Sequence, residues 1–215
     1  MRTGALLSAT LALALAAGCG ALNPKSSDRP SLYSLAEAGE TAGAESPSGA
    51  QAKPRAAATA PTLVVAPPHA AAGFDSRRMI YLRQADKPEY FAHNEWIDTP
   101  ARMLAPLIVG AVESSGAFRA VVATPSPASG EIRLDTEILR LQHDFTSSPS
   151  RVRFTLRAYL VENATRRVIA TREFDAVVPS ASEDPHGGVV AASGAVRTVL
   201  ADLSTFCADA ARTRR

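Results

Sequence analysis

Cysteine is scarce in this chain, and its scarcity limits how the fold can be stabilised. Cys19 and Cys207 are the only cysteines among 215 residues. Cys19 directly follows a short apolar stretch near the amino terminus, a position that indicates a role outside the fold. If Cys19 is modified there, Cys207 has no partner within the chain and an internal disulfide is excluded. We therefore expect Cys207 to be a small buried residue on a helix.

The chain also lacks an excess of charge of either sign. It has 23 lysines and arginines against 21 aspartates and glutamates, which gives a formal net charge of +2. A nucleic-acid-binding protein would be expected to carry a clustered basic face, and the sequence contains none. The composition therefore argues against a nucleic-acid partner.

Motifs that carry catalysis or metal binding are missing as well. No histidine has a second ligand three or four residues away; the four histidines are His69, His93, His143 and His186. There is no glycine-rich phosphate loop and no G-x-S-x-G nucleophile elbow. His143 and Asp144 are adjacent on a predicted strand, so their side chains should point to opposite faces and not act as an acid–base pair. We expect no enzyme activity, no cofactor and no metal, and a structural or solvated His143.

No hydrophobic run is long enough to be a permanent anchor. The longest, ALLSATLALALAA at 5–17, follows Arg2 and has the length of a signal-peptide core, whereas a membrane-spanning helix needs about twenty apolar residues. Residues 16–18 (AAG) lead into Cys19 and resemble the lipobox of bacterial lipoproteins, although Ala16 stands where that motif usually has leucine. Cleavage would then fall between Gly18 and Cys19. The alternative is an ordinary secretory signal with a small-residue cleavage site.

The lipobox resemblance implies that Cys19 carries acyl chains and holds a domain on a membrane. A mature lipoprotein cysteine carries three chains, and two membrane signals already give stable anchoring. Removal of the signal peptide, residues 1–18, takes away one charged residue, Arg2, so the formal charge falls from +2 to +1. Gly20 in place of aspartate implies the outer membrane of a Gram-negative bacterium, at its periplasmic face. No later segment is predicted to span a membrane.

The composition of residues 19–60 predicts a lipid-anchored tether with one short strand. SLYSL at 31–35 is apolar with strand propensity, whereas 36–60 contain ten alanines and no Val, Ile, Leu, Met or aromatic residue. Such a stretch buries too little apolar surface to offset its ordering entropy, which predicts a flexible loop. Tyr33 and Leu35 could instead dock on the following domain as an edge strand. The sequence leaves both possibilities open.

Regular periodicity begins at Pro61 and predicts one domain over 61–210. Strands are predicted at 62–66, 77–83, 88–93 and 118–122. A helix is predicted over 98–116, with Asp98 or Thr99 as N-cap and Pro100 in the first turn. Its apolar stripe consists of Leu104, Leu107, Ile108, Ala111, Val112 and Ser115.

The second half predicts three long antiparallel strands and a final helix. RVRFTLRAYL at 151–160 alternates strictly, and 166–178 alternates after a short turn, which indicates a hairpin. In 131–145 the apolar parity inverts, which predicts a bulge near Ile138 and Leu139. After Pro185 the apolar residues recur at helical spacing. We therefore predict a single α+β domain: a mainly antiparallel sheet with two amphipathic helices packed on one face.

One aromatic segment, PEYFAHNEWIDTPARML at 88–104, is a candidate partner interface. It holds Tyr90, Phe91 and the single tryptophan, Trp96. Exposed aromatic side chains mark interaction sites. The alternative is that these residues cap the core where the helix begins.

Several motifs in order resemble the ABC-type transport auxiliary lipoproteins, the PqiC-like family. They are Y-x-L at 33–35, Y-x-R at 81–83 within RMIYLR, W-x-D-x-P at 96–100, SGAFRAVV, the hairpin strands and the ending VRTVLADLSTFC. The resemblance implies a non-enzymatic component that works with an MCE-domain protein and the permease and ATPase of an ABC transporter. It would dock the periplasmic MCE assembly at the outer membrane for trafficking of phospholipid or another hydrophobic compound. The alternatives are a lipid-binding carrier, with acyl chains held between helices and sheet along the 104–112 stripe, and a structural envelope lipoprotein.

Overall fold

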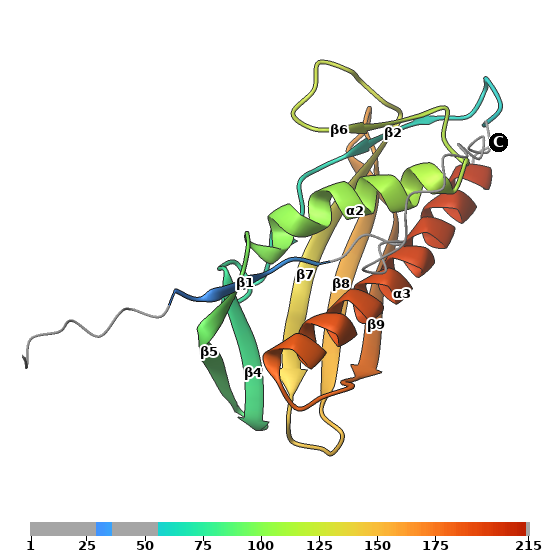
Figure 1. Ribbon diagram of the computed structural model, residues 1–215. Helices are drawn as coiled ribbons and strands as arrows, with labels where there is room; N and C mark the ends of the chain where they lie inside the picture. Colours follow the sequence, from blue (N-terminus) through green and yellow to red (C-terminus); the bar gives the residue numbers. More distant parts are fainter. Residues whose placement is uncertain (1–28, 36–55, 214–215) are drawn as a thin grey trace, which may run out of the picture.

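Nine strands of one sheet and two helices make up residues 29–35 and 56–213, the part of the chain that the computed structural model describes (Figure 1). In chain order the elements are β1 (Ser31–Tyr33), β2 (Thr62–Val65), β3 (His69–Ala70), β4 (Arg78–Gln84), β5 (Lys87–Trp96), α2 (Pro100–Ser114), β6 (Ala120–Ala123), β7 (Ile132–Asp144), β8 (Arg151–Glu162), β9 (Arg167–Pro179) and α3 (Pro185–Arg212). Each strand and helix predicted from the periodicity is present. The predicted signal peptide, Cys19 and most of the predicted loop lie outside the described residues.

The sheet is mixed, which corrects the prediction of a mainly antiparallel one. β7 and β8, β8 and β9, and β4 and β5 pair in antiparallel fashion. The other edge of β7 is lined in succession by β2, β3 and β4, all parallel to it. β2 also pairs in parallel with β6, and β1 with β5. Five of the eight strand pairings are therefore parallel.

The parallel pairings escaped prediction because a short strand does not reveal its direction. All four residues of β2 are buried, a pattern that fits a strand covered on both faces. Parallel neighbours need a long crossover connection, and β3, β4, β5 and α2 lie between β2 and β6 in the chain. The direction of β2 is therefore fixed by the path of the chain and not by its own residues.

The predicted inversion within β7 is confirmed. Ile132, Leu134 and Ile138 are buried before it, and Leu141 and His143 after it. The register against β8 shifts after Ile138. One extra residue in a strand moves the following side chains to the other face, so β7 keeps its apolar face toward the helices over its whole length.

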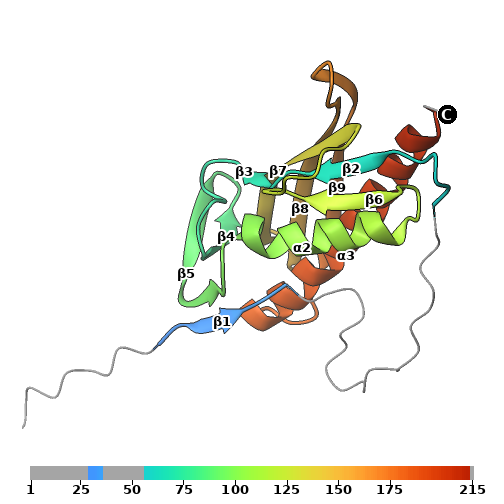
Figure 2. The same cartoon turned by 90° about the horizontal axis from the view of Figure 1, so that it is seen from above.

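Both helices cover the same face of the sheet, as predicted (Figure 1). Seen from above, α2 and α3 lie side by side on one side of β7 and β8 (Figure 2). α2 follows Thr99, whose backbone is extended, and buries Leu104, Ile108 and Val112. α3 is capped by Asp184, whose Oδ1 accepts a hydrogen bond of 2.7 Å from the backbone N–H of Gly187. The core lies between this helical layer and the sheet.

α3 has the length and hydropathy of a membrane-spanning helix, although the sequence was expected to contain no such segment after residue 17. Its most apolar window has a mean hydropathy of 1.3, and 44% of that window is buried. Thirteen residues of α3 are buried, among them Cys207, as predicted. Because α3 packs against β8 and β9, its apolar composition is that of a core helix.

The short strand at 31–35 docks on the domain. β1 pairs in parallel with the end of β5, placing Tyr33 opposite Trp96, and Leu35 is buried. The possibility of an edge strand is thereby confirmed. The described domain therefore begins at this edge of the sheet.

Candidate functional site

The three aromatic residues predicted as an interface do not share one surface. Tyr90 is 43% exposed, and the guanidinium carbon of Arg78 lies 5.0 Å from the centre of its ring. Phe91 is half-buried and packs on Tyr81, with ring centres 4.5 Å apart. Trp96 is only 5% exposed and belongs to the core. The alternative that the segment caps the core therefore holds for Trp96, whereas Tyr90 faces solvent.

An irregularity in the β4–β5 hairpin explains this separation. Arg78 stands opposite Glu95, but Ile80, two residues later, stands opposite Tyr90. Two steps along β4 therefore correspond to five steps along β5, which gives β5 three additional residues. An odd number of additional residues reverses the face of the sheet on which the following side chains lie. Tyr90 and Trp96 have the same sequence parity but end on different sides. The sequence of β5 does not alternate strictly between apolar and polar residues, so it could not predict that Tyr90 and Trp96 lie on different sides.

His143 lies in a buried aromatic cluster beside the first turn of α3. Its Nε2 is 2.9 Å from Ser150 Oγ, its ring centre is 4.0 Å from that of Phe145, and its Nδ1 has no hydrogen-bond partner among the described residues. Burial lowers the pKa of His143, which favours the neutral ring. Asp144 instead accepts a hydrogen bond from the backbone of Thr146. His143 and Asp144 therefore bind different partners, as predicted, and His143 is structural.

Gly188 allows α3 to approach this histidine. A Cβ atom at Gly188 would lie 2.5 Å from His143 Nδ1, closer than van der Waals contact permits. We expect Gly188→Ala to lower the free energy of unfolding by about 1–3 kcal/mol, because the ring of His143 would have to shift away from its contacts with Ser150 and Phe145. Denaturant unfolding measures this loss.

A second glycine of the same helix is the matched control. A Cβ at Gly194 would lie 3.6 Å from Val178, an ordinary contact, so Gly194→Ala should be neutral or raise stability by up to about 1 kcal/mol. In a double-mutant cycle, His143→Ala should remove most of the cost of Gly188→Ala. Strictly additive losses would disprove the proposed clash.

Within the described ranges, no group of three His, Cys, Asp or Glu side chains is placed to hold a metal ion.

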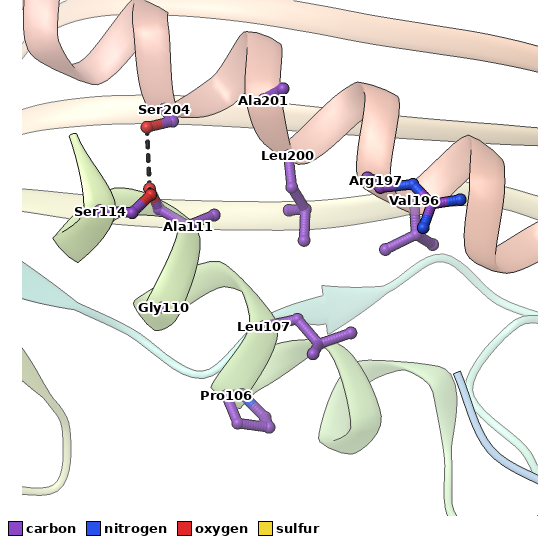
Figure 3. Close-up of a pocket in the computed structure, with 10 residues that line it drawn as sticks. All are labelled: Pro106, Leu107, Gly110, Ala111, Ser114, Val196, Arg197, Leu200, Ala201 and Ser204. Carbon is purple, nitrogen blue, oxygen red and sulfur yellow. Dashed lines mark hydrogen bonds between the residues drawn. The ribbon is translucent and has the colours of Figure 1, made fainter. Parts of the chain in front are cut away.

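A groove of about 550 Å³ lies between α2 and α3 on the outer side of the helical layer (Figure 3). Its floor is formed by the buried residues Val196 and Leu200 together with half-buried Leu107. Its rims are Pro106, Gly110, Ala111 and Ser114 on α2, and Arg197, Ala201 and Ser204 on α3. At one end Ser204 Oγ donates a hydrogen bond of 2.8 Å to the carbonyl of Ala111, which ties the helices together.

Part of the predicted 104–112 stripe lines this groove. Leu107 and Ala111 border it, whereas Leu104, Ile108 and Val112 are completely buried in the core, so the groove lies between the two helices and not between the helices and the sheet. Sequence reasoning missed the groove because it follows from the packing of two distant helices. The available signal was the set of small residues, such as Gly110 and Ala201, at positions between larger ones.

Comparison with known protein families identifies the family of the domain that carries the groove and Tyr90. A family model described as the ABC-type transport auxiliary lipoprotein component matches residues 45–204, well over half of the chain. The chain belongs to this family. Membership confirms the resemblance seen in the sequence motifs and associates the protein with an ABC-type transport system. It covers β2 to most of α3, so the groove and the Tyr90 surface both lie on the family domain.

Solved structures agree with the fold of this auxiliary lipoprotein. The crystal structure of protein XCC0632 from Xanthomonas campestris is 21% identical, covers 86% of this chain and 98% of its own, and superposes with a TM-score of 0.69. An uncharacterised protein is 12% identical, with coverages of 83% and 99% and a TM-score of 0.62. At these identities the likeness concerns the fold alone. No relative was found among the curated proteins.

Proposed function

We propose that this protein is the non-enzymatic, lipid-anchored component of an MCE-type ABC transporter. In this proposal Cys19 holds the domain at the periplasmic face of the outer membrane, and the domain docks the periplasmic MCE assembly that works with the permease and ATPase. The transported material is phospholipid or another hydrophobic compound.

Family membership is the observation that carries the proposal. The position of Cys19 supports the anchor, because it lies only ten positions before Arg29, where the described domain begins. An extended chain of that length spans at most about 35 Å, so a lipid at Cys19 would keep the domain close to the membrane. A docking component needs such proximity to one membrane and a free surface for its partner.

Tyr90 is the best candidate for that free surface. Tyrosine and arginine are enriched among the residues that dominate binding energy at interfaces, and Arg78 stacks on Tyr90 while both are exposed. The remaining alternatives, a carrier that binds lipid itself and a structural envelope lipoprotein, require no such surface.

The decisive experiment is crosslinking of the full-length acylated protein in its own envelope, followed by capture and joint identification of proteins and lipids. Capture of an MCE protein with ABC subunits is the result expected. Recovery of lipid without these proteins would favour the carrier, and recovery of neither would favour the structural role.

Tyr90→Ala should reduce capture of the MCE protein about tenfold or more while leaving the thermal midpoint unchanged, since an exposed ring contributes little to the core. Val168→Ala on β9, which is 53% exposed, removes a different exposed apolar side chain and is the matched control. Equal capture by Tyr90→Ala and the parent protein would exclude this surface as the docking site.

A further inference from the structure

We infer that the groove between α2 and α3 binds an amphiphile with one alkyl chain and an anionic head group, with Arg197 as the partner of the anion. This site is separate from the Tyr90 surface and does not depend on the docking role. The inference comes from the shape of the groove and from its lining, in which Arg197 is the single charged side chain among the described residues.

The helical surface around the groove is almost free of charge. From Met103 to Val112 on α2 there is no charged residue, and from Val189 to Ala201 on α3 Arg197 is the single one. Outer surfaces of helices in water normally carry many charges. The helices are thus apolar on the groove side as well as on the core side.

The volume and the lining suit one small ligand. Ligand pockets typically measure about 300–1,000 Å³, are mostly apolar and contain few polar groups. The groove, at about 550 Å³, is lined by Leu107, Val196 and Leu200 along its floor. These side chains would cover an alkyl chain, and its burial would be favourable in proportion to the apolar area removed from water.

The two ends of the groove differ and give the ligand a direction. At one end the hydrogen bond from Ser204 to Ala111 joins the helices. Arg197 lies at the other end (Figure 3). It is exposed and has no ion-pair partner among the described residues. A guanidinium binds a carboxylate or phosphate through charge-assisted hydrogen bonds. The head group would therefore lie at Arg197 and the chain would run toward Ser204.

Photolabelling of the full-length acylated protein in phosphatidylcholine nanodiscs tests this site. Three diazirine probes with the same alkyl chain are compared: lauric acid, lauryl phosphate and lauryl alcohol. We expect both anionic probes to label peptides around Leu107 and Leu200 about tenfold more than the alcohol does. Preference for the carboxylate would indicate a free fatty acid, and preference for the phosphate a phospholipid-type head group.

Two variants, each with a control, distinguish the contribution of the Arg197 charge from that of the apolar groove. Arg197→Gln should bring anionic labelling down to the level of the alcohol, whereas Arg102→Gln, an exposed arginine of α2 that pairs with Asp98, should change nothing. Gly110→Leu should block all three probes, because a Cβ at Gly110 meets no atom within 4 Å and the larger side chain fills the groove. Gly110→Ala is its matched control, and unchanged thermal midpoints verify that each variant folds.

Equal labelling by the three probes, or labelling that Gly110→Leu leaves intact, would overturn the inference. Labelling that extends over Val190, which is exposed on α3 outside the groove, would indicate contact with the bilayer surface and would overturn it too. Failure of the docking experiment has no bearing on these outcomes.

Discussion

Replacement of Trp96 with alanine is expected to lower the free energy of unfolding by about 3–5 kcal/mol, the usual cost of truncating a large buried aromatic side chain. For a domain of this size the thermal midpoint should fall by about 6–20 °C. Trp96 is 5% exposed and belongs to the same buried cluster as Met79 and Leu141. Its position also fixes β1, since Tyr33 stands opposite it in the parallel pairing.

The backbone of Trp96 adds to its structural role. Its N–H donates to the carbonyl of Arg77 at 2.8 Å, and its carbonyl accepts from Arg77 Nε at 3.0 Å. These contacts position the end of β5 directly before α2. Alanine retains the backbone bonds but leaves a cavity beneath them, and the surrounding residues can relax only in part.

Thermal and denaturant unfolding of the Trp96→Ala and Tyr90→Ala variants measure how much more stability is lost at the buried tryptophan than at the exposed tyrosine. Tyr90→Ala should cost less than about 1 kcal/mol, because its side chain is 43% exposed. If Trp96→Ala instead kept the parent midpoint and lost partner capture, Trp96 would be an interface residue and its packing in the core would be unimportant for stability.

Replacement of Cys19 with alanine should abolish membrane attachment and palmitate labelling. Each buried methylene of an acyl chain contributes about 0.8 kcal/mol to membrane binding, so loss of several chains turns nearly complete attachment into almost none. The protein should appear in the soluble fraction of the periplasm or accumulate as unprocessed precursor. Metabolic labelling with palmitate and fractionation of the envelope measure both effects.

Cys207 provides the matched control, since it is the one other cysteine of the chain. It is buried, and burial raises the pKa of its thiol to about 12, so almost no reactive thiolate exists at neutral pH. Cys207→Ala should therefore keep full labelling and attachment, with a small loss of stability from the missing sulfur. A parent protein without palmitate label would refute the lipoprotein anchor at Cys19.

The sequence alone predicted both helices and most strands of the described domain, because hydrophobic periodicity and turn residues are local properties. β3, which is only two residues long, was not predicted, and the docking of β1 was left open. The strict alternation of β8 and the parity inversion in β7 were sufficient to place both strands and the bulge between Ile138 and Arg140. The motifs from Tyr33 to Pro100 and the carboxyl-terminal helix indicated the family that residues 45–204 then confirmed. The position of Cys19 after an apolar stretch predicts the anchor by the same local reasoning.

Tertiary structure alone decided the directions of the short strands, the side of β5 that Trp96 occupies and the groove between α2 and α3. β2 is parallel to both of its neighbours because the chain crosses the domain before it returns to them. Trp96 turns inward because the hairpin register shifts. Arg197 and Gly110 meet at one groove only because two helices far apart in sequence pack together. Local period reports which residues are buried, whereas contacts between distant segments depend on the path of the whole chain.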